Sequence, residues 1–354
     1  MRTCASDISE IYLKDNKITY LPDWMNELVN LTHLYLHGNS LKKVPAELAT
    51  MKNLTLLDLS ENGLEALPSC VGELGALESL TVDNNYLKKL PTELLGLKNL
   101  RSLSLSNNEF VALPEWLGSC EKLEQLRADD NFLEELPNRL TLAPELCSIS
   151  VCSNRLSYLP LNGFVSCPSI YFRYNPYLNY LSYPVFLQLL ETVGSAGIAL
   201  GQSHTAKKRY NVKNLQISVS YDNEGGYMVV ELPRQLLRVH GVDVRKPVWL
   251  WELALRRIYC KREPTKCKED RGCFGVSYNL LTNGPIAVCS NENCRGPIFT
   301  EAWLIAATCQ QDYDSTDVPV VLLYCSQKYA DLCEIRNNRG KSSDADSADR
   351  QIKL

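Results

Sequence analysis

A phrase of fixed length recurs through the first half of the chain, and it constrains the fold more than any other feature. The interval from Leu31 to Leu54, and again from Leu54 to Leu77, is 23 residues. No insertion interrupts the series, which begins at Ile8 and ends in a shortened eighth copy at Cys167. An asparagine stands at the ninth place of every copy: Asn16, Asn39, Asn62, Asn85, Asn108, Asn131, Asn154 and Asn175. A single copy cannot bury its few leucines alone, so successive copies must stack.

Each part of the phrase predicts a local structure. The alternation of Leu103, Ser104 and Leu105 predicts a short, half-buried strand. The asparagine follows where the chain leaves this strand, and its side-chain amide is expected to bond the backbone of the neighbouring turn. A Leu-Pro or Val-Pro pair then prevents the ladder from resuming, and the rest of the copy is expected to return as an irregular or briefly helical segment.

This order of leucines, asparagine and Leu-Pro resembles the leucine-rich repeat. The resemblance implies an α/β fold, a solenoid whose curved parallel sheet forms a concave face. After the repeats the periodicity stops, and a small α+β module that contains several cysteines is expected. The predicted layout is eight repeats over 1–175, a capping helix over 176–193, a linker over 194–213, the carboxy-terminal module over 214–335 and a disordered tail over 336–354.

Composition limits the partners and the compartment. The chain has 354 residues and a formal net charge of −4. Without a basic bias, nucleic acid is not expected as a partner. No apolar run approaches the roughly 20 residues that span a bilayer, and the first residues lack a signal-peptide apolar region, so we expect no membrane insertion. We therefore expect a cytoplasmic or nuclear protein. In such a compartment the 14 cysteines are expected to be thiols or metal ligands rather than disulfides.

The outward positions of the predicted strands are the first candidate site. Aromatic residues stand at both ends of this face, and small hydroxyl residues fill its middle. Tyrosine and arginine are common anchors in protein interfaces, so a protein client is expected here. The simpler interpretation is that these are solvated strand positions. The predicted partner-binding residues are Tyr12, His33, Tyr35, His37, Asp58, Asp83, Arg127, Asp129, Tyr171 and Arg173.

A predicted helix over 247–261 is the second candidate site. Its apolar residues Leu250, Leu253, Ala254 and Ile258 share one stripe. One interpretation is an amphipathic core helix. The other is a helix that inserts spaced apolar anchors into a groove of a partner.

Cysteines near the end of the chain are the third candidate site. Cys289 and Cys294 flank a turn rich in asparagine, and Cys325 ends an apolar run. This arrangement is typical of a zinc knuckle and its partner strand. No histidine follows His240, so the ligands would be thiolates, which suit zinc. Alternatively, these cysteines are small buried hydrophobic residues.

The segments "LWELALRRIY", "VCSNENCRGPIFT" and "VVLLYCSQKYADLC" resemble the tail of the group formed by leucine-rich repeat-containing proteins 58 and 28. The resemblance implies a substrate receptor of a cullin–RING ubiquitin ligase, recruited through an Elongin-type box of the form Leu-x-x-Leu-Ala/Cys-x-x-x-Ile. Leu250, Leu253, Ala254 and Ile258 match that form. The chain departs from the group at Trp249, where a polar residue is usual, and "VSYNLLTNG" lacks the Leu-Pro expected for cullin contact.

The resemblance also bears on the fourth metal ligand. In the group, a fourth cysteine comes four residues after the third, and Tyr329 occupies that place here. A helix would put Cys333 about 12 Å along its axis from Cys325, so Cys333 completes the site only if that segment loops. Cys309 and Cys273 are alternatives, as is loss of the site. The predicted ligands are Cys289, Cys294, Cys325 and Cys333.

The sequence is compatible with three classes of protein function. The favoured one is a protein-interaction receptor, in its narrower form a ligase receptor that binds Elongin and a cullin. The alternative is an intracellular signalling scaffold similar to the short Ras-pathway repeat proteins. An enzyme is the least favoured class: His33 and His37 lie near Asp58, yet the spacing names no nucleophile with its base.

Overall fold

The computed structural model describes residues 8–167, 169–193, 215–220, 227–233, 235–240, 248, 250–260, 283–291, 293–311, 314–326 and 328–329. The described chain forms two compact units. The first comprises the chain up to Leu156 together with Phe164–Asn175, and the second comprises Ser157–Gly163 and the chain from Pro176 onward. The predicted linker (194–213) and tail (336–354) lie outside the described residues.

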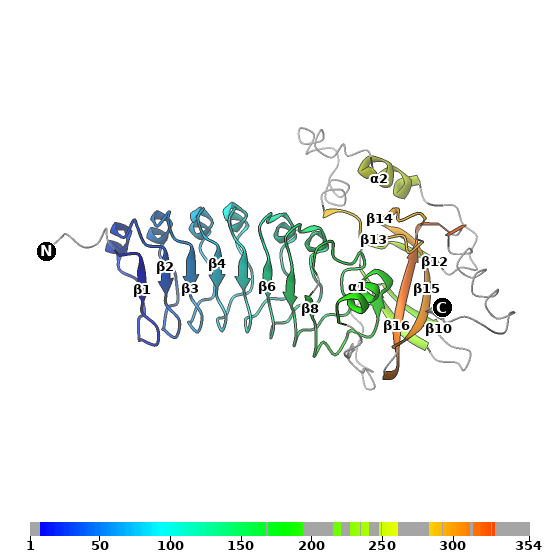
Figure 1. Ribbon diagram of the computed structural model, residues 1–354, viewed down its shortest axis with the longest axis horizontal. Helices are drawn as coiled ribbons and strands as arrows, with labels where there is room; N and C mark the ends of the chain where they lie inside the picture. Colours follow the sequence, from blue (N-terminus) through cyan, green and yellow to red (C-terminus); the bar gives the residue numbers. More distant parts are fainter. Residues whose placement is uncertain are drawn as a thin grey trace. The chain divides into compact units, whose positions relative to one another are not determined.

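The first unit is built on one sheet of eight parallel strands in chain order (Figure 1). Each strand is three residues long and pairs in register with the equivalent residues of the next copy, as Leu57 does with Leu80. The predicted solenoid is therefore confirmed. The strands are β1 (Glu10–Tyr12), β2 (His33–Tyr35), β3 (Leu56–Asp58), β4 (Ser79–Thr81), β5 (Ser102–Ser104), β6 (Gln125–Arg127), β7 (Ser148–Ser150) and β8 (Ser169–Tyr171).

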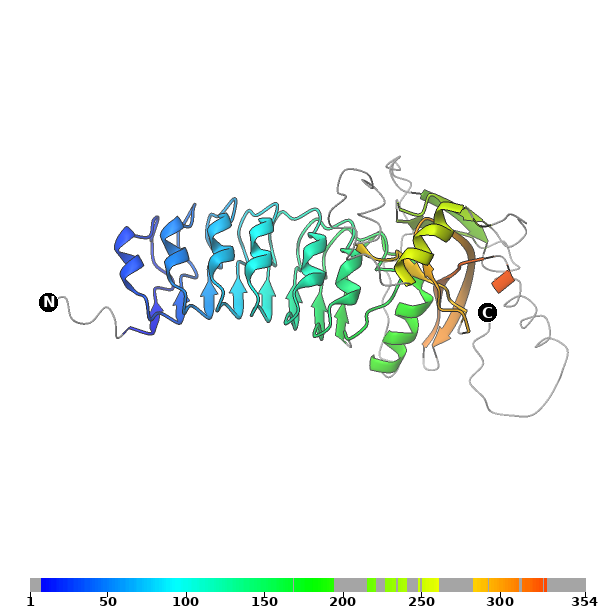
Figure 2. The same ribbon diagram turned by 90° about the horizontal axis from the view of Figure 1, so that it is seen from above.

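Short 3₁₀ helices form the opposite side of the first unit (Figure 2). Each follows the proline of its copy, whose extended backbone, for example φ −76° and ψ 144° at Pro114, turns the chain away from the sheet. The central residue of each strand from β2 to β8 is buried, as are most of the leucines in the helical segments. The helices are η2 (Asp23–Glu27), η3 (Ala46–Thr50), η4 (Ser69–Glu73), η5 (Thr92–Gly96), η6 (Glu115–Ser119) and η7 (Asn138–Leu142).

The predicted asparagine ladder is present. In the fifth copy, Asn108 Nδ2 donates to the carbonyl of Val82 at 3.0 Å and to that of Leu105 at 3.1 Å, and its Oδ1 accepts from Leu87 N at 3.0 Å. Val82 and Leu87 belong to the preceding copy, so one side chain joins two turns of the solenoid. The residue before each ladder asparagine has a positive φ, between 49° and 68°. At Gly38 this turn is so tight that an added Cβ would lie 2.3 Å from Asp15 Oδ1.

The second unit contains a four-stranded sheet in the order β12-β15-β16-β9. The predicted hairpin is confirmed, since β10 (Leu215–Ser220) pairs antiparallel with β11 (Tyr227–Leu232). Trp303 and Phe299 are buried, and the Tyr180 hydroxyl donates to the Glu231 carbonyl. The remaining elements are β9 (Leu181–Ser182), α1 (Tyr183–Val193), β12 (Arg238–His240), α2 (Leu250–Cys260), β13 (Ala287–Val288), β14 (Pro297–Ile298), β15 (Glu301–Gln311) and β16 (Asp314–Tyr324).

Two predicted helices can be compared with these elements. The residues 176–193, predicted as a capping helix, include α1, which packs against β9 and β16. The helix predicted over 247–261 is α2, which begins at Leu250. Neither these helices nor any other in the described residues is long and apolar enough to cross a bilayer.

We expect Asn108→Ala to lower the free energy of unfolding by about 1–3 kcal/mol, because it leaves buried backbone groups of two copies without their partner. Chemical denaturation measures this change. Asn16→Ala is the matched control: Asn16 is exposed and, among the described contacts, its amide bonds only the Leu13 and Lys14 carbonyls of its own copy. Equal losses in the two variants would contradict a stabilising role for the ties between copies.

Candidate functional site

The outward side chains of β1–β8 and of the positions that follow them form the concave face. The central residue of each strand points inward, so the residues on either side of it point outward. In-register pairing places equivalent residues side by side, as Arg127 of β6 pairs with Ser150 of β7, and Ser150 with Tyr171 of β8. The face therefore consists of columns that run across the strands.

Aromatic rings gather at the β1 end of the concave face. The rings of Tyr12 and Tyr35 stack with centroids 4.5 Å apart and an interplanar angle of 9°. Lys14 Nζ lies 4.8 Å from the centroid of Tyr35, and the His33 ring is 6.3 Å from it. Tyr12 remains 62% exposed. Its hydroxyl donates to Glu10 Oε2 at 2.7 Å, and this hydrogen bond is the main reason that the pKa of Tyr12 is raised to about 12.

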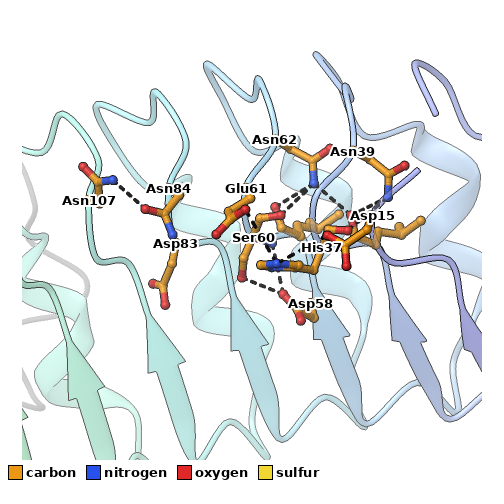
Figure 3. A network of polar contacts seen from close by, with 12 residues as sticks. Asp15, His37, Asn39, Asp58, Ser60, Glu61, Asn62, Asp83, Asn84 and Asn107 are labelled. Carbon is orange, nitrogen blue, oxygen red and sulfur yellow. Dashed lines mark hydrogen bonds and ion pairs between the residues drawn. The ribbon is translucent and has the colours of Figure 1, made fainter. Parts of the chain in front are cut away.

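His37 lies beside this aromatic group. Its Nε2 is 4.0 Å from Asp15 Oδ1 and 3.7 Å from Glu61 Oε2 (Figure 3). Each of these acids belongs to a neighbouring copy, on either side of His37. When protonated, the imidazole would form ion pairs with both carboxylates, and such partly exposed pairs contribute little to stability. Asp58, which the sequence placed near the histidines, accepts hydrogen bonds from Ser60.

The carboxylates in the middle of the concave face accept hydrogen bonds from other residues of the protein. Asp58 Oδ1 accepts from Ser60 N at 3.0 Å and from Ser60 Oγ at 2.6 Å (Figure 3). Asp83 accepts from the Ser104 hydroxyl at 2.8 Å and from Ser106 N at 2.7 Å, both in the next copy. Burial raises the pKa of Asp83, although these two hydrogen bonds act in the opposite direction.

Asp129 repeats this arrangement two copies further along the sheet. It accepts from Ser150 Oγ at 2.6 Å and from Cys152 N at 2.7 Å. The sequence reading missed these ties, because the hydroxyl partner of each carboxylate lies 21 residues away. Asp83 and Asp129 therefore join copies, and the small hydroxyl residues are partly occupied by them rather than left open to a partner.

Exposed arginine and tyrosine side chains of the concave face lie toward β8. Arg127, Tyr171 and Arg173 are exposed, and Tyr171 has an exposed fraction of 55%. Further exposed aromatic side chains, which the sequence reading did not single out, follow the ladder asparagines: Tyr86 after Asn85 and Phe132 after Asn131. The guanidinium of Arg155 lies 4.5 Å from the Phe132 ring centroid. These residues extend the exposed aromatic surface along one edge of the sheet.

Helix α2 presents apolar side chains to solvent. Leu250 is 78% exposed and Leu253 46% exposed, and Ala254 is also exposed, whereas Leu255 is buried. The side chain of Ile258 lies outside the described residues. For the three described positions, the core-helix interpretation of the stripe is wrong, because the helix packs through its opposite face.

A buried ion pair holds that opposite face. Glu252 is fully buried, and its carboxylate accepts from Phe299 N at 2.9 Å and from Thr300 N at 2.6 Å. Arg256 Nε donates to the same carboxylate at 2.8 Å, and Arg256 Nη1 donates to the Cys325 carbonyl at 2.8 Å. In the sequence, the four-residue spacing of Glu252 and Arg256 indicates an ion pair on one helix face. The spacing does not indicate that the pair is buried.

Three of the four predicted metal ligands come together. Cys289, Cys294 and Cys325 have sulfur atoms that all lie within 4.8 Å of one another. Cys289 and Cys325 are buried and Cys294 is half-buried. Cys333 and Cys273 lie outside the described residues, as does the side chain of Cys309.

The comparisons with known proteins agree with the repeat architecture. Residues 21–127 match the family model described as a leucine-rich repeat region. Among solved structures, a leucine-rich repeat protein of Leptospira interrogans is 23% identical, with 50% of this chain and 54% of that chain aligned and a TM-score of 0.41. The leucine-rich repeat domain of the type III effector XopL is 23% identical, with 49% and 62% aligned and a TM-score of 0.43.

Internalin C2 of Listeria monocytogenes is 30% identical, with 43% of this chain and 64% of that chain aligned and a TM-score of 0.37. The aligned part thus spans less than two thirds of each of these structures. No curated protein matches the chain. Residues 21–127 are thus similar to the leucine-rich repeat family, and the fold of the first unit is a leucine-rich repeat solenoid. Solenoids of this kind present extended concave surfaces.

We expect Glu252→Ala to destabilise the second unit by about 3–5 kcal/mol, because it leaves the Arg256 charge and two backbone amides buried without their partner. Denaturation followed by the fluorescence of the buried Trp303 measures the change. Leu250→Ala on the same helix is the control, and its exposed side chain predicts little loss. If the two variants unfolded at the same denaturant concentration, the ion pair would not be what holds α2.

Proposed function

We propose that the chain is a receptor that binds a protein client on the concave face. The observation that carries this proposal is the set of exposed anchors: Tyr12 at one end of the face, and Arg127, Tyr171 and Arg173 toward the other. Tyrosine and arginine supply a large share of the binding energy in protein interfaces. Because the middle carboxylates bond within the protein, the client is held mainly at the two ends.

The concave face alone has less area than a standard protein interface, so we expect the edge of the sheet to contribute to client binding. Eight strands at a spacing of about 4.8 Å extend roughly 34 Å, and five residues add about 17 Å, which gives about 580 Å². A standard interface takes about 800 Å² from each partner. The exposed rings of Tyr86 and Phe132 lie on the edge that follows the ladder asparagines and supply additional area.

The charge of the anchors suggests the chemistry of the client. Arg127 and Arg173 are exposed, while the nearby acids Asp83 and Asp129 bond to serine hydroxyls and backbone amides. A client segment that carries acidic side chains would form charge-assisted hydrogen bonds with the two guanidinium groups. The stacked tyrosines at the other end would receive an apolar or aromatic part of the same client.

The narrower form of the proposal is a substrate receptor of a cullin–RING ubiquitin ligase. Helix α2 would supply the contact with the Elongin-type adaptor. Its support is the exposure of Leu250, Leu253 and Ala254, the described residues that match the adaptor box. Spaced apolar side chains on one helix face insert into a groove of a partner. A signalling scaffold without a ubiquitin role is the alternative, and it predicts client binding without Elongin.

Arg127→Glu combined with Arg173→Glu should reduce client capture, because both guanidinium groups are exposed and would be replaced by charges that repel an acidic client. Affinity purification followed by mass spectrometry compares the captured proteins. Lys43→Glu with Lys98→Glu reverses two exposed charges outside the sheet and is the matched control. Asp129 is unsuitable for such a test since its substitution would break the tie to Ser150. Undiminished capture by the first double variant would place the client elsewhere.

Leu250→Ser with Leu253→Ser should abolish co-purification of Elongin and a cullin while leaving the fold intact, because both side chains are exposed. Circular dichroism and thermal unfolding report the fold. Arg257→Ala, an exposed change on the same helix, is the control and should retain both partners. A wild-type chain that captures its client but never Elongin would favour the signalling scaffold. Unfolding of the double serine variant would instead mean that this stripe stabilises the unit.

A further inference from the structure

The three clustered cysteines sit on a turn and a strand end that the backbone holds together. Strands β13 and β14 pair through Ala287 and Ile298, and Cys289 N donates to the Gly296 carbonyl at 2.8 Å, which closes the turn that carries Cys294. Ser290 N donates to the Leu323 carbonyl at 2.7 Å, and this bond fixes the turn to the end of β16, where Cys325 follows. The sulfur atoms therefore converge through secondary structure rather than by chance approach of flexible segments.

The spacing of the sulfur atoms fits a shared metal ion and not a disulfide. Cys294 Sγ and Cys325 Sγ are 3.4 Å apart, and all three sulfur atoms lie within 4.8 Å of one another. A disulfide requires about 2.05 Å. Two thiolates that bind one tetrahedral zinc at about 2.3 Å lie about 3.8 Å apart. The 3.4 Å separation is slightly below that value, and the 4.8 Å limit on the other separations includes it.

The surroundings of the sulfur atoms favour thiolates and leave room between them. Cys325 N approaches Cys289 Sγ at 3.5 Å, so a backbone amide points at a sulfur. A Cβ at position 296 would lie 3.3 Å from Cys294 Sγ and 3.9 Å from Cys325 Sγ, and glycine there keeps this space open.

Among the described residues, the cluster offers three ligand atoms. No fourth cysteine, histidine or carboxylate joins Cys289, Cys294 and Cys325 in that part of the chain. A zinc ion with three protein ligands takes water or another small ligand in its fourth position.

We propose that Cys289, Cys294 and Cys325 bind one zinc ion through three thiolates. Binding displaces the thiol protons to solvent, since only thiolates are ligands. The site is independent of the proposed client and adaptor surfaces, because neither includes a cluster cysteine.

The first test is elemental analysis of the purified full chain. We expect about one zinc per chain in the wild type, as for a structural zinc site. Cys294→Ser should lose the metal. Cys260→Ser, which removes an exposed thiol of α2 in the same unit, is the matched control and should retain it. A metal-free wild type, or one in which mass spectrometry finds a disulfide between Cys294 and Cys325, would overturn the proposal.

The second test does not depend on removing a ligand. Gly296→Ala keeps every thiol, but its added methyl group would lie 3.3 Å from Cys294 Sγ and crowd that sulfur atom. We expect its affinity to fall about 10-fold or more, the effect of disturbing the surroundings of a metal ligand. Titration of the chelated protein with Co²⁺, followed by the thiolate-to-cobalt charge-transfer absorption, measures the affinity. Unchanged affinity in this variant would contradict the shared metal position.

The number of thiolates is tested by a further variant in the same titration. Cys333→Ser should leave the metal content and the cobalt spectrum unchanged, because three thiolates hold the ion. Loss of metal in this variant would overturn the three-thiolate site in favour of a site with four.

Discussion

The side-chain amides of the ladder asparagines are the interaction on which the first unit depends. Each turn leaves backbone carbonyls and an amide buried without a strand partner, and buried polar groups without partners are costly. Asn62 shows how one residue meets this need: its Nδ2 donates to the Leu36 carbonyl of the preceding copy at 3.0 Å, and its Oδ1 accepts from Leu41 N at 2.9 Å (Figure 3). Because every copy is joined to the one before by the same geometry, the strands remain in register and the outward positions form straight columns.

These columns explain why charged residues with similar positions in the repeat have different roles. Asp83 and Asp129 stand next to serines of the following copy and become ties between copies, as the 2.8 Å and 2.6 Å hydrogen bonds show. Arg127 is also in register with Ser150, but the Ser150 hydroxyl donates to Asp129, and Arg127 remains exposed. A carboxylate can accept a hydroxyl hydrogen, whereas a guanidinium can only donate. A partner would therefore meet a face whose middle is internally bonded and whose ends carry exposed anchors.

Sequence periodicity was sufficient to predict the sheet, the ladder and the short helical returns, because a 23-residue repeat fixes both neighbours of every copy. The spacing of the cysteines, outside the repeats, predicted that Cys289, Cys294 and Cys325 come together, because it suggested a turn and a strand end. Sequence periodicity could not predict that Asp83 is engaged or that Glu252 is fully buried. Both depend on contacts between residues that are 21 to 48 positions apart in the chain, outside the fixed relation between strand neighbours. The apolar stripe of α2 was visible, but whether it faces the core or solvent was decided by the burial of Glu252.

Helix α2 and the cysteine cluster share a structural support in the second unit. The carboxylate of Glu252 is bonded by the backbone of Phe299 and Thr300, just after β14, while Arg256 extends from it to the carbonyl of Cys325. The same β13–β14 turn carries Cys289 and Cys294. The polar face of the helix is therefore attached to the two segments that bring the thiols together. This attachment accounts for the orientation of α2: with its charged pair bonded on the inner side, Leu250 and Leu253 are left on the outer side, where a partner can reach them.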